Sequence, residues 1–304
     1  MKGRLLSRRW AWMHVLVCGL IIWAGGVAAV VLTDNPILVP GVFLIGSFLV
    51  PFSLLFWVYE QIGWGGITTS RTALDPYRVL LAFACGGALG VTCSALLEDL
   101  LMKYFDTVYY LCVGVTEESV KLALVWLLAR NLTSYSRRDG MLLGASVGLG
   151  FSAFESAGYA FNAAIGAHGH DLVTVLQTQA TRGLLTPVGH ALWTSLVAGA
   201  LFAAARGGHL RLTRSVFGWL AIAIALHVGW DASGGLATIL AVASAGQAAT
   251  HTEYLTGQLT NPIGHEAIVY SVTLTVLQSI DAAIALLLGW RMWRRANREL
   301  ATAV

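Results

Sequence analysis

Charged side chains are scarce in this sequence: Asp, Glu, Lys and Arg make up only 12% of its 304 residues. A soluble globular domain usually carries about a quarter charged residues, so too little polar surface is available here to cover one soluble core. The net charge of +3 is small and gives no indication of nucleic-acid binding. Hydrophobic residues instead reach 57%, and the mean hydropathy is +0.70. This composition is typical of a membrane protein.

Cysteines and recognisable metal motifs are also few. All four cysteines fall inside apolar runs, which fits neither a disulfide framework nor the spacing of a cysteine metal site. The zinc-protease motif H-E-x-x-H is absent, as are a low-complexity tail and a clear internal repeat. The sequence therefore contains no soluble domain whose chemistry could be recognised from its motifs.

Apolar runs long enough to cross a membrane are abundant. About 20 apolar residues span the hydrocarbon core. The first qualifying run is longer than the 7–15 residues of a signal-peptide core, so we expect it to be retained as a helix. We predict an all-α polytopic transmembrane helix bundle that forms a single domain over residues 1–304. About eight runs qualify: 10–32, 38–59, 77–97, 108–129, 141–165, 185–205, 215–239 and 268–290.

The positions of Lys and Arg predict the orientation of these helices. If the N-terminus lies inside, sixteen of the nineteen Lys and Arg residues fall on the cytoplasmic side. Cytoplasmic loops of membrane proteins carry such an excess. The sequence therefore predicts a multi-pass protein with both termini in the cytoplasm, an arrangement called N-in and C-in.

Ionisable residues at membrane depth are the most informative feature. A charged side chain at a helix centre costs roughly 2.5–3.5 kcal/mol on insertion scales. Exposing all of them to lipid would cost on the order of 10 kcal/mol, comparable to the stability of a domain. We therefore expect them to converge in one polar interior, in the middle or outer half of the bilayer. They lie on four consecutive predicted helices: Glu117, Glu118, Lys121, Glu155, His190, His227 and Asp231.

Helical spacing assigns neighbours within this set. Lys121 follows Glu117 by four residues and Glu118 by three, so it can pair with either carboxylate. His227 and Asp231 share one helix face, which lets Asp231 fix the tautomer and orientation of the imidazole.

Glycines recur at four-residue spacing around the start of the predicted run 141–165. Gly140, Gly144 and Gly148 form such a ridge, which lets neighbouring helices approach closely. We interpret the ridge as a packing feature. Asp281 has no partner motif, and we interpret it as structural.

Four short motifs carry these residues in order. They read E-E-x-x-K at 117–121, F-E-x-x-x-Y at 154–159, H-x-x-x-T at 190–194 and H-x-x-x-D at 227–231. Their order and one-per-helix placement resemble the PrsW family of intramembrane proteases, which is related to the CAAX-processing and bacteriocin-processing (CPBP) proteases. The resemblance covers about 100–235, the motif-bearing core. Residues 1–99 and 240–304 supply flanking helices and a long outer loop.

The resemblance implies an intramembrane endopeptidase that cleaves membrane-protein substrates near the outer half of the bilayer. In bacteria the family is associated with a first, site-1 cut in anti-sigma factors, so it implies such a substrate and a bacterial plasma membrane. It also implies the catalytic set Glu117, Glu118, Glu155, His190, His227 and Asp231, supported by Lys121, Tyr159 and Thr194.

Two mechanisms remain open at this point. In the metal-free one, which we rank slightly ahead, Glu117 activates water while Glu118 and Lys121 tune it. His190, or His227 held by Asp231, then stabilises the oxyanion, and Glu155 completes the site. In the other mechanism zinc binds three protein ligands and water. His190 and His227 would supply two of these ligands, and Glu155, Glu117 or Glu118 the third.

Other functional classes use the same residue types. Buried carboxylates line ion or solute paths in transporters. A non-catalytic scaffold of the same fold, or a hydrolase acting on lipid amides, would also hold them. Flux through liposomes that survives Glu117→Gln would favour transport, and a substrate panel would separate the hydrolases.

Overall fold

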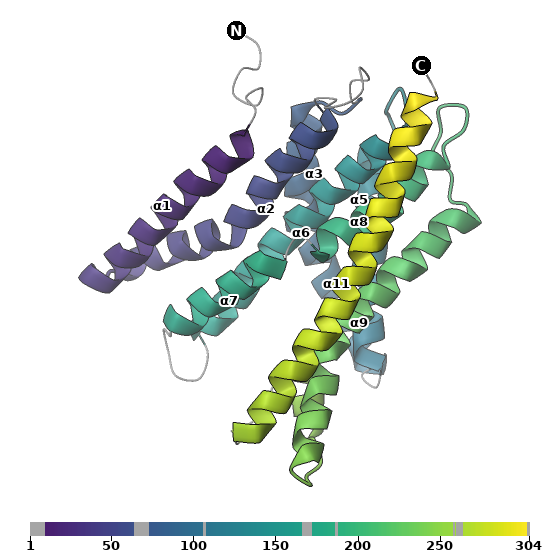
Figure 1. Ribbon diagram of the computed structural model, residues 1–304. Helices are drawn as coiled ribbons and strands as arrows, with labels where there is room; N and C mark the ends of the chain where they lie inside the picture. The colour runs from purple at the N-terminus through teal and green to yellow at the C-terminus, as the bar shows by residue number, and fades with distance from the viewer. Residues whose placement is uncertain are drawn as a thin grey trace.

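The computed structural model describes residues 10–63, 73–105, 108–165, 172–185, 188–257, 259 and 264–302 (Figure 1). Within these ranges every named element is a helix, which confirms the all-α fold. In chain order the elements are α1 (Ala11–Thr33), η1 (Pro36–Leu38), α2 (Val39–Gly63), α3 (Pro76–Cys85), the π-helix η2 (Gly86–Val91), α4 (Thr92–Phe105), α5 (Tyr109–Ala129), α6 (Arg137–Ile165), α7 (Leu172–Leu185), α8 (His190–Ala203), α9 (Arg214–Ser244), α10 (His251–Thr256) and α11 (Gly264–Ala301).

Six helical stretches of the described chain are long and apolar enough to cross a membrane. They are 11–33, 36–61, 76–105, 175–203, 214–244 and 264–301, and residues 186 and 187 of the fourth lie outside the described chain. Helices α5 and α6 are 21 and 29 residues long, so they also have spanning length, but they carry charged residues. The chain is thus a multi-pass membrane protein, while the count of eight crossings stays a prediction.

The structure differs from the sequence prediction at two stretches expected to be outer segments. Residues 172–185 form helix α7, almost wholly between the predicted runs 141–165 and 185–205, and polar groups of this helix find partners inside the bundle. The Gln179 amide, for example, donates to the carbonyl oxygens of Val42 and Phe43, at 3.2 and 2.9 Å. In the predicted outer loop 240–267, α9 continues to Ser244, and α10 forms with a capping box between Thr250 and Glu253.

Helix α6 lies at the centre of the bundle, with α1 and α2 on one side and α9 and α11 on the other (Figure 1). It packs along α8 because its glycines leave room for the α8 backbone. A Cβ on Gly140, Gly144 or Gly148 would meet the carbonyl oxygens of Ala198, Thr194 and His190, respectively. The packing interpretation of this glycine ridge is therefore confirmed. Helix α6 is also approached closely by η2, where a Cβ on Gly86 would meet the backbone of Val147.

Candidate active site

The ionisable residues predicted from the sequence meet in the interior of the bundle. Glu117, Glu118 and Lys121 come from successive turns of α5, and all three are buried. Helix α6 contributes Glu155, α8 begins at His190, and α9 supplies His227 and Asp231. With Arg182 of α7, they form a group of eight residues that we call the polar cluster: Glu117, Glu118, Lys121, Glu155, Arg182, His190, His227 and Asp231.

Lys121 joins two helices at the centre of the cluster. Its fully buried ammonium donates to Glu117 Oε2 at 3.0 Å and to Glu118 Oε1 at 2.9 Å. The same nitrogen lies 2.7 Å from Nδ1 of His190 and 3.8 Å from the centre of the Phe151 ring. Because a buried ammonium needs opposite charge around it, these contacts explain how Lys121 is accommodated at membrane depth.

His227 is held between carboxylates on both sides of its ring. Nδ1 lies 3.0 Å from Glu118 Oε1, and Nε2 lies 3.2 Å from Asp231 Oδ2. The Trp193 indole stacks on the imidazole, with ring centres 4.9 Å apart. The predicted pairing of His227 with Asp231 is thus present, and Glu118 adds a second restraint on the ring.

His190 is oriented in the same manner by a different carboxylate. Its Nε2 lies 2.9 Å from Glu155 Oε2, and its Nδ1 faces Lys121. Glu155 also forms an ion pair with Arg182, whose Nε donates to Ser156 Oγ at 2.9 Å. The Arg182 guanidinium lies over the ring of Tyr159, 4.2 Å from its centre. The chain Arg182–Glu155–His190 therefore links α7, α6 and α8.

Three of these side chains could hold a metal ion. One donor atom each from Glu117, His190 and His227 lies within 4.8 Å of the others, and all three residues are buried. His190 Nδ1 is 3.9 Å and His227 Nε2 3.6 Å from Glu117 Oε2. Bonds of about 2.0–2.2 Å to one zinc ion place donor atoms roughly 3–4 Å apart, so this group needs only a small adjustment.

The surroundings of the three donors suit a divalent cation. The ring nitrogens that face away from Glu117 contact Glu155 and Glu118, the outer carboxylate partners that metal-binding histidines usually have. With neutral imidazoles, the four carboxylates of the polar cluster exceed its two cations by two charges. Two of the three donor atoms have other contacts in this arrangement: His190 Nδ1 with the Lys121 ammonium and His227 Nε2 with Asp231. A metal would replace both contacts, leaving Lys121 paired to Glu118 and Asp231 beside the site.

The carboxylate in this group is Glu117, whereas the sequence also allowed Glu155 or Glu118. In the described geometry Glu155 contacts the opposite nitrogen of His190, and Glu118 contacts the opposite nitrogen of His227. The arrangement therefore favours Glu117 as the third ligand and the other two glutamates as residues that orient the imidazoles.

A cavity of about 1060 Å³ reaches the polar cluster. Glu117, Glu155, Arg182 and Asp231 line it, whereas Glu118 and Lys121 do not. A second cavity of about 80 Å³ lies against Glu155, His190 and Asp231, enough for a few water molecules at about 30 Å³ each. A substrate in the large cavity would therefore meet Glu117 rather than Glu118.

Thr194 is the predicted supporting residue that the structure does not bring into the cluster. It is buried, and its hydroxyl has no hydrogen-bond partner among the described residues. Its carbonyl oxygen instead lies against Gly144, so its place belongs to the packing of α6 on α8. Tyr159, by contrast, lines the large cavity beside Arg182, and its supporting role stays a prediction.

Two residues at the site were missed by sequence reasoning. Neither Arg182 nor Glu98 is among the residues that the sequence motifs single out. Glu98 lines the same large cavity, and its buried Oε1 has no hydrogen-bond partner among the described atoms. Arg182 is the one charged residue among the apolar and neutral residues of 172–185, and this isolation is the sequence signal that could have identified it as a site residue.

Gly148 fixes the position of His190, so a larger residue at position 148 should disturb the site. Because a Cβ here would overlap the His190 carbonyl oxygen, Gly148→Ala should move the first turn of α8 away from α6. We expect a loss of about 1–3 kcal/mol in stability from overpacking, and lower activity because His190 leaves Glu155. The matched control is Gly218→Ala, which adds its methyl to open space. Thermal unfolding and substrate turnover measure both effects, and normal turnover in Gly148→Ala would contradict the placement of His190.

Fold and site together define a class: a multi-pass membrane protein with a buried Glu/His/His group able to hold a metal. A family model described as PrsW family intramembrane metalloprotease matches residues 75–253, more than half of the chain. The chain therefore belongs to the PrsW family of intramembrane metalloproteases and is a peptidase. The match contains all eight residues of the polar cluster. No curated protein and no solved structure matches the chain.

Proposed function

We propose that this chain hydrolyses peptide bonds of membrane-protein substrates at a metal centre held by Glu117, His190 and His227. The observation that carries the proposal is the convergence of these three buried donors beside a cavity of about 1060 Å³. A metal bound there supplies Lewis-acid activation of water and of the scissile carbonyl. The family description as metalloprotease moves this mechanism ahead of the metal-free one. Zinc is our choice because a His/His/Glu ligand set is typical of catalytic zinc.

The other cluster residues then divide the remaining tasks. Asp231 has the most exposed carboxylate of the cluster, at 30%, and lines both cavities. It is therefore placed to take a proton from the attacking water and return it to the leaving amine. Glu155 and Glu118 orient His190 and His227, which makes them positioning residues.

Arg182 and Tyr159 are two of the hydrogen-bond donors that line the substrate cavity, and they lie beside Glu155. The guanidinium is fixed by Glu155 and Ser156 from one side and lies over the Tyr159 ring on the other. Donors fixed in this manner stabilise negative charge that develops on a carbonyl oxygen without first having to reorganise. We assign Arg182 to that role in the proposed reaction.

The proposed setting is a bacterial plasma membrane crossed eight times, with both termini in the cytoplasm. Helices α5 and α6 have spanning length and add to the six apolar stretches. The start of α1 and the end of α11 lie at the same end of the bundle, as an even number of crossings requires (Figure 1). The proposed substrates are single-pass membrane proteins, with anti-sigma factors as the first class to test.

The site of cleavage follows from backbone chemistry. Carbonyl groups inside a membrane helix are hydrogen-bonded, and breaking those bonds in lipid costs several kcal/mol. We therefore predict cleavage at a helix end or a locally unwound segment near the outer face. Co-expression with candidate single-pass proteins, followed by mass spectrometry of the fragments, locates the cut. The control is the same co-expression with the Glu117→Ala/Glu118→Ala double variant.

Matched substrates sharpen this experiment. One carries a Gly-Pro pair next to the cut site to unwind the helix, and the other carries Ala-Leu at the same positions. The unwound substrate should be cleaved at least about tenfold faster, because one less hydrogen-bonded turn must open. Equal cleavage of both, or a cut in the middle of the intact helix, would show that local unwinding is not required.

A further inference from the structure

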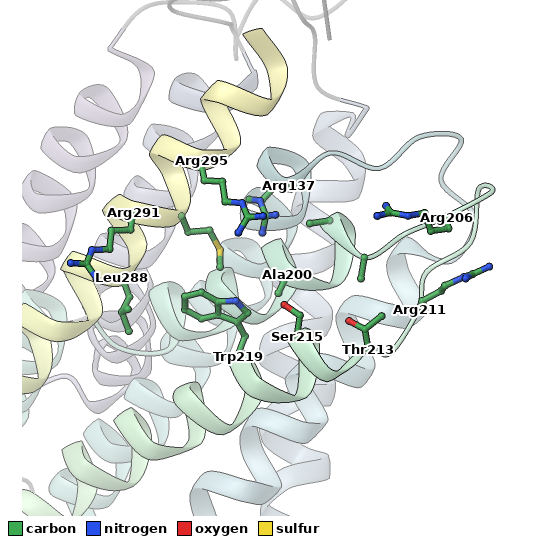
Figure 2. A pocket seen from close by; sticks show the side chains of 13 residues that line it. Arg137, Ala200, Arg206, Arg211, Thr213, Ser215, Trp219, Leu288, Arg291 and Arg295 are labelled. Carbon is green, nitrogen blue, oxygen red and sulfur yellow. The ribbon is translucent and has the colours of Figure 1, made fainter. Parts of the chain in front are cut away.

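A third cavity lies away from the polar cluster, towards the end of the bundle where α11 ends (Figure 2). Its volume is about 640 Å³. The start of α6, the end of α8, the segment 204–213, the start of α9 and the last turns of α11 surround it. No residue of the catalytic set lines this cavity, so it needs an explanation of its own.

Five arginines and no acidic residue line the cavity. Figure 2 shows Arg291 and Arg295 on the α11 side, and Arg206 and Arg211 on the opposite side. Arg137 lies between them near Arg295. Five arginine side chains around one cavity favour an anion, because arginine binds phosphate oxygens through two parallel N–H bonds.

The protein itself neutralises little of this charge. Glu299 accepts two hydrogen bonds from Arg137, at 3.0 and 2.9 Å, and one from Arg295 at 3.2 Å. No hydrogen bond or ion pair joins Arg211 or Arg291 to any described side chain. The five positive charges around this cavity therefore share a single carboxylate partner within the described chain.

The opposite wall of the cavity is apolar. It consists of Trp219 of α9, Leu288 and Met292 of α11, and three alanines at the C-terminal end of α8. Leu288 precedes Arg291 by three residues, which places it about 4.5 Å deeper along the helix axis. Trp219 follows Ser215 by four residues, about 6 Å deeper. Charge at the rim and apolar surface one turn below it match the order of headgroup and acyl chain in a lipid.

We propose that this cavity binds an anionic phospholipid. The phosphodiester lies among the arginines, and the first methylene groups of the acyl chains lie against Trp219, Leu288 and Met292. A free phosphate would use the arginines but leave the apolar wall uncovered. Basic pockets between transmembrane helices at the membrane surface suit such headgroups. This binding is separate from peptide hydrolysis and does not depend on the proposed metal.

The test measures lipid retention by the full chain in nanodiscs made of nine parts phosphatidylcholine and one part phosphatidylglycerol. Native mass spectrometry of the released protein counts bound phosphatidylglycerol. The cavity variant is Arg211→Gln/Arg291→Gln, whose side chains are exposed and whose removal breaks no described ion pair. We expect roughly tenfold weaker retention, since each basic residue near a membrane surface contributes substantially to anionic lipid binding.

A matched control separates the cavity from general surface charge. Arg294→Gln/Arg298→Gln also removes two positive charges, both near the end of α11 but outside the cavity. It should retain phosphatidylglycerol like the wild type. Equal loss in both double variants, or no loss in the cavity variant, would overturn the proposal. Competition with inorganic phosphate and glycerol 3-phosphate distinguishes the sources of the anion: displacement of the lipid by either at millimolar concentration would show a soluble-anion site instead.

Discussion

Glu117→Gln is expected to reduce peptide-bond hydrolysis by at least about a thousandfold, the range seen when a group acting directly on the reacting atoms is removed. The amide keeps the size of the side chain but loses the negative charge that faces both histidines and Lys121. Turnover of a purified single-pass substrate in nanodiscs measures the loss. Thermal unfolding of the variant checks that the bundle still forms.

The neighbouring carboxylate provides the most informative comparison. Glu118 does not line the cavity and contacts Lys121 and His227 from behind. Because Glu118 is a positioning residue, we expect Glu118→Gln to reduce activity about 10–100-fold. Asp99→Asn, which changes an exposed carboxylate of α4, should have no effect. If Glu118→Gln is the inactive variant and Glu117→Gln retains more than a tenth of the activity, the roles of the two glutamates are reversed. The substrate then does not reach the site through the large cavity that Glu117 lines.

Much of this site could be predicted from the sequence because a membrane leaves buried charges few options. Glu117, Glu118 and Lys121 cannot face lipid without a large cost, and neither can Glu155. Their convergence followed from that constraint, and the spacing of His227 and Asp231 placed those two on one face. The glycine ridge of α6 was likewise readable, since small residues at four-residue spacing allow close helix approach.

The remaining features depend on distances between helices, which hydropathy and spacing do not contain. The choice of Glu117 over Glu155 as partner of both histidines depends on how α5, α6 and α8 are rotated against one another. Arg182 was missed because hydropathy averages over a window. The polar residues of α7 lower that average, whereas in the bundle they are paired with α2 and α6. The same averaging assigned part of 240–267 to a loop where α10 forms.

Metal removal is the other experiment with a large expected effect. Purified protein should contain about one divalent ion per chain, with zinc expected from the ligand set. Dialysis against a chelator should remove the ion and the activity together, and stoichiometric zinc should restore both. Elemental analysis and substrate turnover are measured on the same samples. Full turnover by protein stripped of metal would instead support the metal-free mechanism, in which Glu117 alone activates water.

Variants of the three proposed ligands and of their partners should behave differently in this experiment. His190→Gln and His227→Gln each lose a ligand, so added zinc should not restore activity. Glu155→Gln loses only the hydrogen bond that orients His190, so zinc affinity should fall about 10–100-fold while excess zinc recovers much of the activity. That difference distinguishes a ligand from a positioning residue. If excess zinc fails to rescue Glu155→Gln but rescues Glu117→Gln, then Glu155 is the third ligand, as the sequence also allowed.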